Sequence, residues 1–355
     1  MLEEREKNWI KSRFRRYYVK HELKPDAVEQ REFGYGNWEK KIEARHLSFE
    51  NSEKLNEFLR EHAPLYVSRS TAYYERPAAQ PMNNKGWRGS DLVFDLDAEM
   101  EIFDRGIFEK VRSDAIRLIE EFLIPEFGVD KNKIALVFSG NRGFHVHVFD
   151  ERFRMLGREA RREIASYLAG IGLDYKKFFD VDKKSKKILG PTPKEAGYRG
   201  RFARMVIETL ETEPEKISRV FNEAEERNRF VEGIKQGVWS RTRLPKVIER
   251  LEGVAKELPV KSINVDVGVT QDTSKLIRLP GSLHGSTGFV VLPVKKYDME
   301  IENAIAFGEE RVKIKVNENV EVKIGEGMKA EKGSVVDAPE YLALYLLLKN
   351  KANLL

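Results

Sequence analysis

The chain of 355 residues contains no cysteine. Disulfide bonds, a cysteine nucleophile and a thiolate zinc site are therefore excluded. Long apolar segments are missing as well. The longest uninterrupted run, Tyr341–Leu348, has eight residues, whereas a membrane-spanning helix needs about twenty. The N-terminus opens with charged residues and lacks the apolar core of a secretory signal. We therefore expect a cytoplasmic protein with no membrane segment.

Charge of both signs is abundant, and it is unevenly distributed. Charged residues make up 34% of the chain, but 63 Lys and Arg nearly balance 58 Asp and Glu. The hydrophobic share of 41% is enough for a core and excludes a disordered chain. Residues 1–20 carry seven basic and three acidic side chains, and residues 176–204 carry ten and three. These two basic segments indicate a localised polyanion site, although each could also be an ordinary solvated face.

Hydrophobic periodicity and turn signals predict an α+β fold. Helices are expected at 3–20, 52–61, 108–125, 155–169 and 337–350. Strands are expected at 91–97, 133–138, 144–149, 262–269 and 289–294, with a hairpin at 311–324. A loop is expected at 190–200, which contains two prolines and three glycines. We expect a discontinuous core of residues 1–204 and 257–330, a helical subdomain at 205–256, and a C-terminal helix within 331–355.

Two carboxylates stand two positions apart in the predicted strand at 91–97. Because side chains alternate along a strand, Asp95 and Asp97 project to one face while Phe94 and Leu96 project to the other. Paired carboxylates repel each other unless something neutralises them, and a divalent metal ion does so with oxygen ligands. A solvated polar face would carry the same pattern.

A second polar block, Ser139–His147, lies between two predicted strands. Its glycines would let backbone N–H groups approach an anion, and Arg142 and His145 would add positive or hydrogen-bonding groups. It is not a Walker loop, because no Gly-Lys-Ser/Thr follows. His145 and His147 share a strand face, so a metal site, a weak likeness to an RNA-recognition motif, and a plain polar turn all stay open.

A third block begins with Asp266 in the predicted strand at 262–269. It continues with the run Arg278-Leu279-Pro280-Gly281-Ser282-Leu283-His284. This run combines turn formers with side chains that typically bind phosphate. A plain glycine-rich loop would look similar.

Taken together, the three blocks resemble the small catalytic subunit of archaeo-eukaryotic DNA primase in its archaeal form. That family carries a D-x-D strand, an S-G-x-x-G-x-H block, and an Asp eighteen residues before the His of an R/K-x-P-x-S-x-H run. Asp266 and His284 have this spacing. The segments Arg31–Gly34 and Arg69–Pro77 are similar to upstream segments of the family. The resemblance covers about residues 5 to 295.

The resemblance implies an α+β catalytic core of mixed sheets with an RRM-like element, and it implies roles for individual residues. Asp95, Asp97 and Asp266 match the acidic triad that binds two Mg²⁺ or Mn²⁺ ions. The residues that match nucleotide- and triphosphate-binding positions are Ser139, Arg142, His145, Arg278 and His284. Arg31 matches an arginine that the family needs for activity.

Two positions depart from the pattern of the resembled family. Archaeal members usually hold a cysteine/histidine zinc knob between the acidic strand and the Ser-Gly block, but residues 98–138 contain neither residue type. No zinc site is therefore expected, and the predicted helix at 108–125 would replace the knob. Ser286 stands where many members have a lysine, which would remove one phosphate contact.

The function implied by the resemblance is primer synthesis on single-stranded DNA from NTPs or dNTPs, with a large primase subunit as partner. Three alternatives stay open. The D-x-D pair with His145, His147 and His284 could serve a metal-dependent phosphodiesterase or nuclease. An RRM-like module could bind nucleic acid without chemistry. A bacterial ligase-associated repair polymerase is a further relative, but the N-terminal Arg-Glu-Phe segment and the absence of a fused ligase disfavour it.

Overall fold

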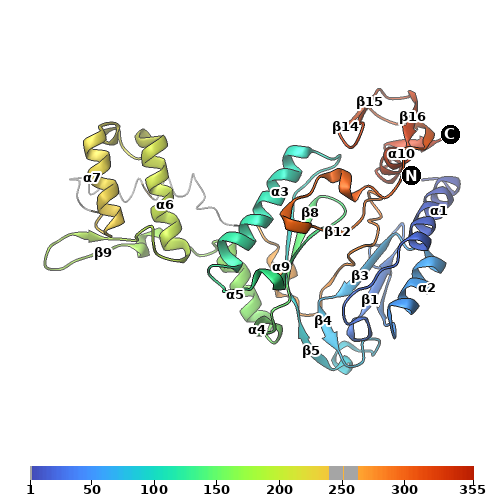
Figure 1. Cartoon of the computed structure of the whole chain (residues 1–355), viewed down its shortest axis with the longest axis horizontal. Helices are drawn as coiled ribbons and strands as arrows, with labels where there is room; N and C mark the ends of the chain where they lie inside the picture. Colours follow the sequence, from blue (N-terminus) through green and yellow to red (C-terminus); the bar gives the residue numbers. More distant parts are fainter. Residues whose placement is uncertain (1, 240–250, 252–262) are drawn as a thin grey trace. The chain divides into compact units, whose positions relative to one another are not determined.

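The structure, a computed structural model, describes residues 2–239, 251 and 263–355. Contacts divide the chain into two compact units (Figure 1). The first contains residues 1–120, 129–165 and 264–355, and the second contains 121–128 and 166–263. The division differs from the expected one, because residues 166–204 and 121–128 group with the second unit and the C-terminal segment groups with the first.

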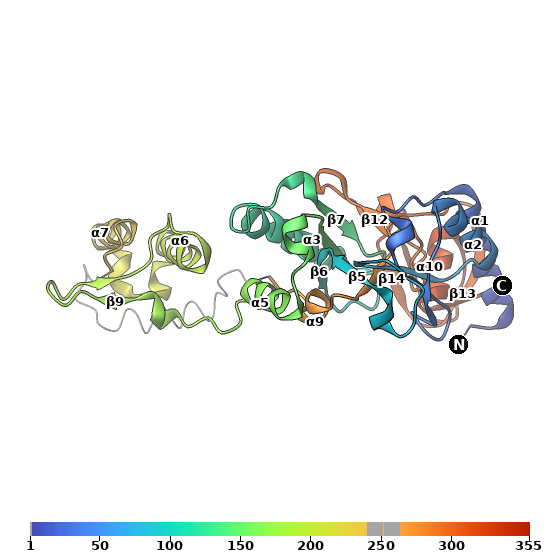
Figure 2. The same ribbon diagram turned by 90° about the horizontal axis from the view of Figure 1, so that it is seen from below.

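One four-stranded antiparallel sheet of the first unit has the order β11–β3–β1–β2. Its strands are β1 Phe33–Gly36, β2 Ala44–Leu47, β3 Tyr66–Ser70 and β11 Leu276–Arg278. Helices α1 Glu4–Lys20 and α2 Ser52–His62 lie side by side next to this sheet (Figure 1, Figure 2). The two helices bury one apolar face each, and the ring of Phe58 on α2 lies 5.4 Å from that of Tyr35 on β1.

A second antiparallel sheet has the order β12–β7–β8–β6. Its strands are β6 Leu92–Asp97, β7 Ile134–Phe138, β8 Gly143–Val148 and β12 Leu292–Pro293. Helix α3 Arg105–Arg117 connects β6 to β7, and Phe108 on this helix contacts the rings of Phe138 and Phe144. The apolar residues of the sheet therefore face α3, and its polar residues face the other way.

Along the chain the order is β6, α3, β7, β8, and in the sheet β8 lies between β6 and β7. This is a split βαβ arrangement in which β8, the hairpin partner of β7, fills the space between the two strands that α3 connects. The fold is α+β, with mixed helices and antiparallel sheets. The other elements here are a short ladder of β4 Ala72–Tyr74 and β5 Trp87–Ser90, helix α4 Glu151–Arg154, most of α5 Arg158–Leu168, and α9 Val267–Gln271. None of the described helices is both long and apolar enough to cross a membrane.

The C-terminal part of the first unit is built from short strands around a buried helix. Strands β16 Val335–Pro339, β13 Arg311–Val316 and β17 Ala352–Leu354 form one sheet, and β14 Val320–Val322 pairs with β15 Met328–Ala330. Helix α10 Glu340–Leu348 is buried along its whole length. A helix buried on all sides carries no polar face, which explains why every residue after Glu340 is aliphatic or aromatic.

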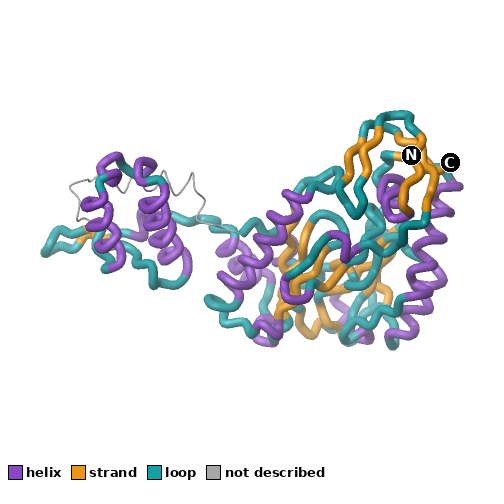
Figure 3. The backbone as a smooth tube through the Cα atoms, turned by 45° about the horizontal axis from the view of Figure 1, so that its top comes forward, coloured by secondary structure: helices purple, strands orange, loops and turns teal. Residues whose placement is uncertain are grey.

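The second unit combines a hairpin with helices (Figure 3). Strands β9 Asp180–Val181 and β10 Ile188–Leu189 pair, and α6 Gly197–Thr212 and α7 Ala224–Lys235 follow. Its core is aromatic: the ring of Trp239 contacts those of Phe179, Phe202 and Phe230. Most of the expected helical region beyond 239 lies outside the described residues.

Three sequence expectations about local structure are wrong. Residues 262–269 form no strand where the structure describes them, because Asp266 caps α9 instead. The expected hairpin at 311–324 is absent, since β13 pairs with β16 and β17 while β14 pairs with β15. The expected loop at 190–200 ends at Gly197, where α6 begins. In each case tertiary pairing overrides a local pattern.

Candidate active site

The polar face of β6 carries the two carboxylates that the alternation predicts. Asp95 pairs in register with His145 of β8, and Asp97 pairs with Gly143. Asp95 Oδ1 lies 3.7 Å from His145 Nε2, and the Asp95 side chain is 28% exposed against 42% for Asp97. The two acids therefore stand at the end of a rigid strand, where an incoming ligand can reach them.

A third carboxylate approaches Asp95 from α9. The backbone N–H of Asp266 donates to the backbone carbonyl of Asp95 at 3.0 Å, and its Oδ1 accepts from Val269 N at 3.1 Å. Burial, together with the negative charges of Asp97 and Asp266, raises the pKa of Asp95 to about 6. The structure thus brings together the three acids that the sequence singled out.

The Ser139–Gly143 turn joins β7 to β8 and is held against the loop that contains His284. Gly140 has φ +83°, and a Cβ built there would lie 2.7 Å from His284 Cβ, so only glycine fits. Thr287 Oγ1 donates to the Gly140 carbonyl, and Gly143 N donates to Ser139 Oγ at 3.2 Å. The two loops that the sequence associated with phosphate are therefore one structural unit.

The basic groups of the site have defined partners. Arg142 donates to Asp97 Oδ2 through Nη2 at 2.7 Å and through Nε at 3.1 Å. Arg278 on β11 donates to Ser68 Oγ at 2.9 Å and lies over the Tyr66 ring. His284 Nδ1 accepts from the backbone N–H of Ser286 at 3.2 Å, and the Ser286 hydroxyl lies 2.7 Å from that of Tyr66.

Both histidines of the site are held neutral. Burial, with a contribution from the nearby Arg278, lowers the pKa of His145 to about 3. Burial likewise lowers the pKa of His284 well below its usual value, with Arg278 and two lysines adding to the effect. A neutral imidazole can donate one hydrogen bond to a phosphate oxygen without the cost of burying a second cation.

These groups line one pocket of about 300 Å³. The predicted residues that line it are Asp95, Asp97, Ser139, Arg142, His145, Arg278 and His284. Carboxylates stand on the β6 side, whereas arginine and histidine stand on the side of β11 and the two tied loops. A pocket with carboxylates beside cations can hold a phosphorylated ligand together with metal ions.

The acidic residues expected to bind metal ions have other partners in the structure. No group of three His, Asp or Glu side chains among the described residues is close enough to hold a metal ion. Asp97 is instead paired with Arg142 and Asp266 caps α9. The donor set nevertheless fits a hard divalent cation. All three donors are carboxylates. Burial, together with the negative charges of Asp97 and Asp266, raises the pKa of Asp95, and a bound cation would compensate that charge.

A family model described as DNA primase small subunit matches residues 94–295, a range that contains all three polar blocks. The chain belongs to this family. It is 34% identical to the DNA primase small subunit PriS of Archaeoglobus fulgidus, with 98% of each chain covered.

Further relatives extend the family assignment over nearly the whole chain. PriS of Pyrobaculum islandicum is 33% identical over 95% of each chain, and PriS of Methanosarcina acetivorans is 31% identical over 99% of this chain and 97% of the relative. Among solved structures, the polymerase domain of Mycobacterium tuberculosis ligase D in complex with DNA gives a TM-score of 0.35 at 12% identity, covering 83% of this chain and 84% of that one. This similarity is too low to support an inference about the fold or the function of this chain.

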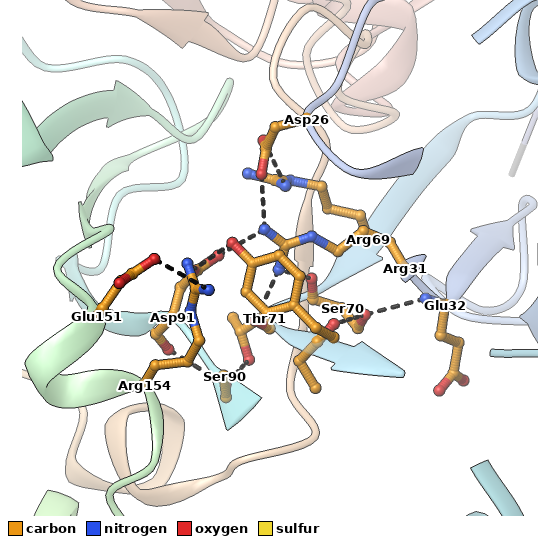
Figure 4. Close-up of polar contacts among 12 residues, drawn as sticks. Asp26, Arg31, Glu32, Arg69, Ser70, Thr71, Ser90, Asp91, Glu151 and Arg154 are labelled. Carbon is orange, nitrogen blue, oxygen red and sulfur yellow. Dashed lines mark hydrogen bonds and ion pairs between the residues drawn. The ribbon is translucent and has the colours of Figure 1, made fainter. Parts of the chain in front are cut away.

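Two residues singled out from the primase resemblance do not line this pocket. Asp266 is bonded to Asp95 through its backbone but is not part of the pocket lining. Arg31 does not line the pocket; it is completely buried in a polar network (Figure 4). Its guanidinium donates to Asp26 and Asp91 at 2.7 Å each, and to the backbone carbonyls of Ser70 and Thr71. Arg31 therefore holds the segment that leads into β6 and does not point at a ligand.

The structure also adds pocket residues that the sequence did not single out. These are Lys41, Ser68, Asn141 and Lys275, together with apolar neighbours. Asn141 lies inside the Ser-Gly block and could have been included with it. The two lysines carry no local signal, because isolated lysines are common on any surface.

Proposed function

We propose that this primase small subunit synthesises short primers on single-stranded DNA by transferring nucleotides from NTPs. The observation that supports the proposal is one pocket in which Asp95 and Asp97 face Arg278 and His284, inside the residue range that the primase family model matches. In the reaction, a 3′-hydroxyl attacks the α-phosphate of the incoming nucleotide and pyrophosphate leaves.

The acidic side of the pocket is the proposed metal side. Asp95, Asp97 and Asp266 would hold two Mg²⁺ or Mn²⁺ ions. Bound there, such ions lower the pKa of the attacking hydroxyl and neutralise charge on the phosphates. To bind an ion, Asp97 would release Arg142, and the guanidinium would then be free to contact the triphosphate. The Asp97–Arg142 ion pair would thus be replaced by two others, between Asp97 and the metal ion and between Arg142 and the triphosphate.

The basic side of the pocket binds and orients the nucleotide. The guanidinium groups of Arg278 and Arg142 can each donate two parallel hydrogen bonds to the oxygens of a phosphate group. His145 and His284, held neutral, donate single hydrogen bonds, and Ser139 adds a hydroxyl. Positioning and electrostatics together account for catalysis of this kind, with no covalent step on the protein.

Two partners follow from this function. The basic segments 1–20 and 176–204 would contact the template backbone, and their binding would weaken with salt. The relatives are named small subunits, and we propose a large primase subunit as the second partner of this chain. We expect the complex to act in the cytoplasm, because the relatives are archaeal proteins and archaeal cells have no nucleus.

The experiment is de novo synthesis on unprimed single-stranded DNA, with NTPs or dNTPs and with Mg²⁺ or Mn²⁺. The wild type should form short products, and Asp95→Asn should form none. Asp95→Asn should remain folded, because the ionised carboxylate is unfavourably buried and its loss removes repulsion. Asp298→Asn, at an exposed site, serves as the control.

Two other outcomes would replace the proposal. Hydrolysis of nucleic acid without added nucleotides, abolished by Asp95→Asn, would identify a metal-dependent nuclease. Strand binding that needs no metal, with no product from any nucleotide, would identify a binding module.

A further inference from the structure

The last helix of the chain packs directly on the loop that carries His284. A Cβ built on Gly288 would lie 2.6 Å from Leu344 Cδ2 of α10 and 3.6 Å from Leu348 Cδ1. The rings of Phe289 and Tyr345 are stacked, with centroids 5.6 Å apart. Helix α10 therefore covers the 284–289 loop with no space for an added methyl group.

The residue that ends this helix contacts the other loop of the pocket. Lys349, the C-cap of α10, donates from Nζ to Asn141 Oδ1 at 3.3 Å. Asn141 lies in the Ser139–Gly143 turn and lines the pocket. A side chain from the C-terminal segment thus stands beside the groups that we propose to bind the triphosphate, more than two hundred residues from the turn in sequence.

Lys349 is a partly buried cation without an anion. No carboxylate within the described part of the chain lies within 4.0 Å of its Nζ, although Lys351, two residues on, pairs with Glu101 and Glu318. The charges that act on Lys349 are mostly positive: Arg142, Lys351 and Lys41, with Glu101 as the acidic neighbour. Burial, with a contribution from Arg142, lowers the pKa of Lys349 to about 8.

Such an arrangement costs stability in the free protein. A cation removed from water needs a partner of opposite charge. The amide of Asn141 and the ring of Tyr345, whose centroid lies 5.6 Å from Nζ, are both neutral. The groups around Lys349 also include the Arg142 guanidinium, which is itself a candidate phosphate ligand. An anion placed among these cations would relieve their mutual repulsion.

We propose that Lys349 binds the triphosphate of the incoming nucleotide and so completes the pocket from the C-terminal end of the chain. This rests on the proposed function. The contact is one charge-assisted hydrogen bond from Nζ to a phosphate oxygen. A phosphate of the template backbone offers the same chemistry, so the test must separate the two sources.

The test compares Lys349→Met, Lys349→Arg and the control Lys332→Met, which removes an exposed lysine of the same C-terminal part. Lys349→Met should raise the apparent KM for NTP in primer synthesis about tenfold, as expected for one hydrogen bond to a charged group. Lys349→Arg should restore part of the affinity. The affinity for single-stranded DNA should stay unchanged in all three variants.

The thermal midpoint gives a readout that a merely structural role would not produce. Removing a desolvated cation should leave the midpoint of Lys349→Met equal to that of the wild type or above it. An unchanged KM would overturn the proposal, as would a lowered midpoint with loss of kcat alone. Weakened DNA binding with unchanged KM would also overturn it and point to the template phosphate.

Equilibrium titration with ATP in the absence of template separates this proposal from the proposed function. If the wild type makes no primers but binds ATP, and Lys349→Met weakens that binding, the lysine contact stands and the function fails. If the wild type makes primers and all variants bind ATP equally, the function stands and the lysine contact fails.

Discussion

Arg31 and Asp91 form a buried ion pair at 2.7 Å, with side-chain exposures of 0% and 2%. Tyr73 closes the pair, because its hydroxyl donates to the other oxygen of Asp91 at 2.9 Å and its ring lies under the Arg31 guanidinium. Asp91 immediately precedes β6, the strand that carries the catalytic candidates. The pair therefore fixes the start of that strand relative to β3 and β4.

Replacement of Arg31 should act through stability. Arg31→Met leaves Asp91 as a buried carboxylate without its cation, which costs about 3–5 kcal/mol of unfolding free energy. Urea unfolding would measure this loss, and primer synthesis would be compared per folded molecule. If Arg31→Met kept its stability while raising the KM for NTP, Arg31 would be a ligand-binding residue and not a positioning one.

Replacement of Arg278 should act through nucleotide binding. Its guanidinium lines the pocket, and its contacts in the protein are the hydroxyl of Ser68 and the face of Tyr66. Arg278→Met should raise the apparent KM for NTP by at least tenfold, because a bidentate phosphate contact is lost. Steady-state kinetics against NTP concentration would show this, with Arg311→Met, at an exposed ion pair, as the control. If Arg278→Met and the wild type had equal KM values for NTP, Arg278 would not bind the triphosphate.

The hairpin of β9 and β10 should contribute salt-dependent binding to single-stranded DNA. Asp182 shapes its turn by accepting from Lys184 N at 3.0 Å and from the hydroxyl of Ser185. The lysines that this turn exposes are Lys183, Lys184, Lys186 and Lys187. Each phosphate contact contributes about 0.7 to the slope of log K against log salt on a single strand, so four contribute about 3.

Changing these four lysines to serine should reduce both the affinity and the slope in fluorescence titrations at several salt concentrations. The matched control changes four exposed lysines of the C-terminal strands and turns to serine, with the same loss of charge: Lys313, Lys315, Lys323 and Lys329. A similar fall in slope in both variants would mean that net charge alone matters and that the hairpin has no particular role.

Acid should remove a specific contribution of Asp150. The Arg152 guanidinium and the Arg152 backbone N–H hold the pKa of Asp150 at about 2, below its ordinary value. A depressed carboxyl pKa contributes stability at neutral pH, and this contribution is lost as the pH falls from about 4 to about 2. Asp150→Asn should therefore lower the thermal midpoint at pH 7. The gap to the wild type should narrow toward pH 2, and a gap that stayed constant with pH would contradict this assignment.

The sequence by itself determined the faces of the local elements and the family of the chain. A strand with a period of two places Asp95 and Asp97 together whatever surrounds it, and the structure shows both on the polar face of β6. The three polar blocks pointed to primase, and the family match confirmed that reading. The shared face of Asp95 and Asp97 depends only on residues close together in the chain, and the family assignment depends on motifs at fixed spacing. Both can be read from the sequence without knowledge of the tertiary structure.

Tertiary structure alone decided which distant segments meet in and around the pocket. Asp266 reaches Asp95 through the start of a helix, although its apolar neighbours resembled a strand. Arg31 is held by Asp91 and Asp26, and Lys349 reaches the Ser139–Gly143 turn from α10. These placements depend on the packing of whole elements and on the cost of burying an unpaired charge, and neither leaves a periodic signal in the sequence.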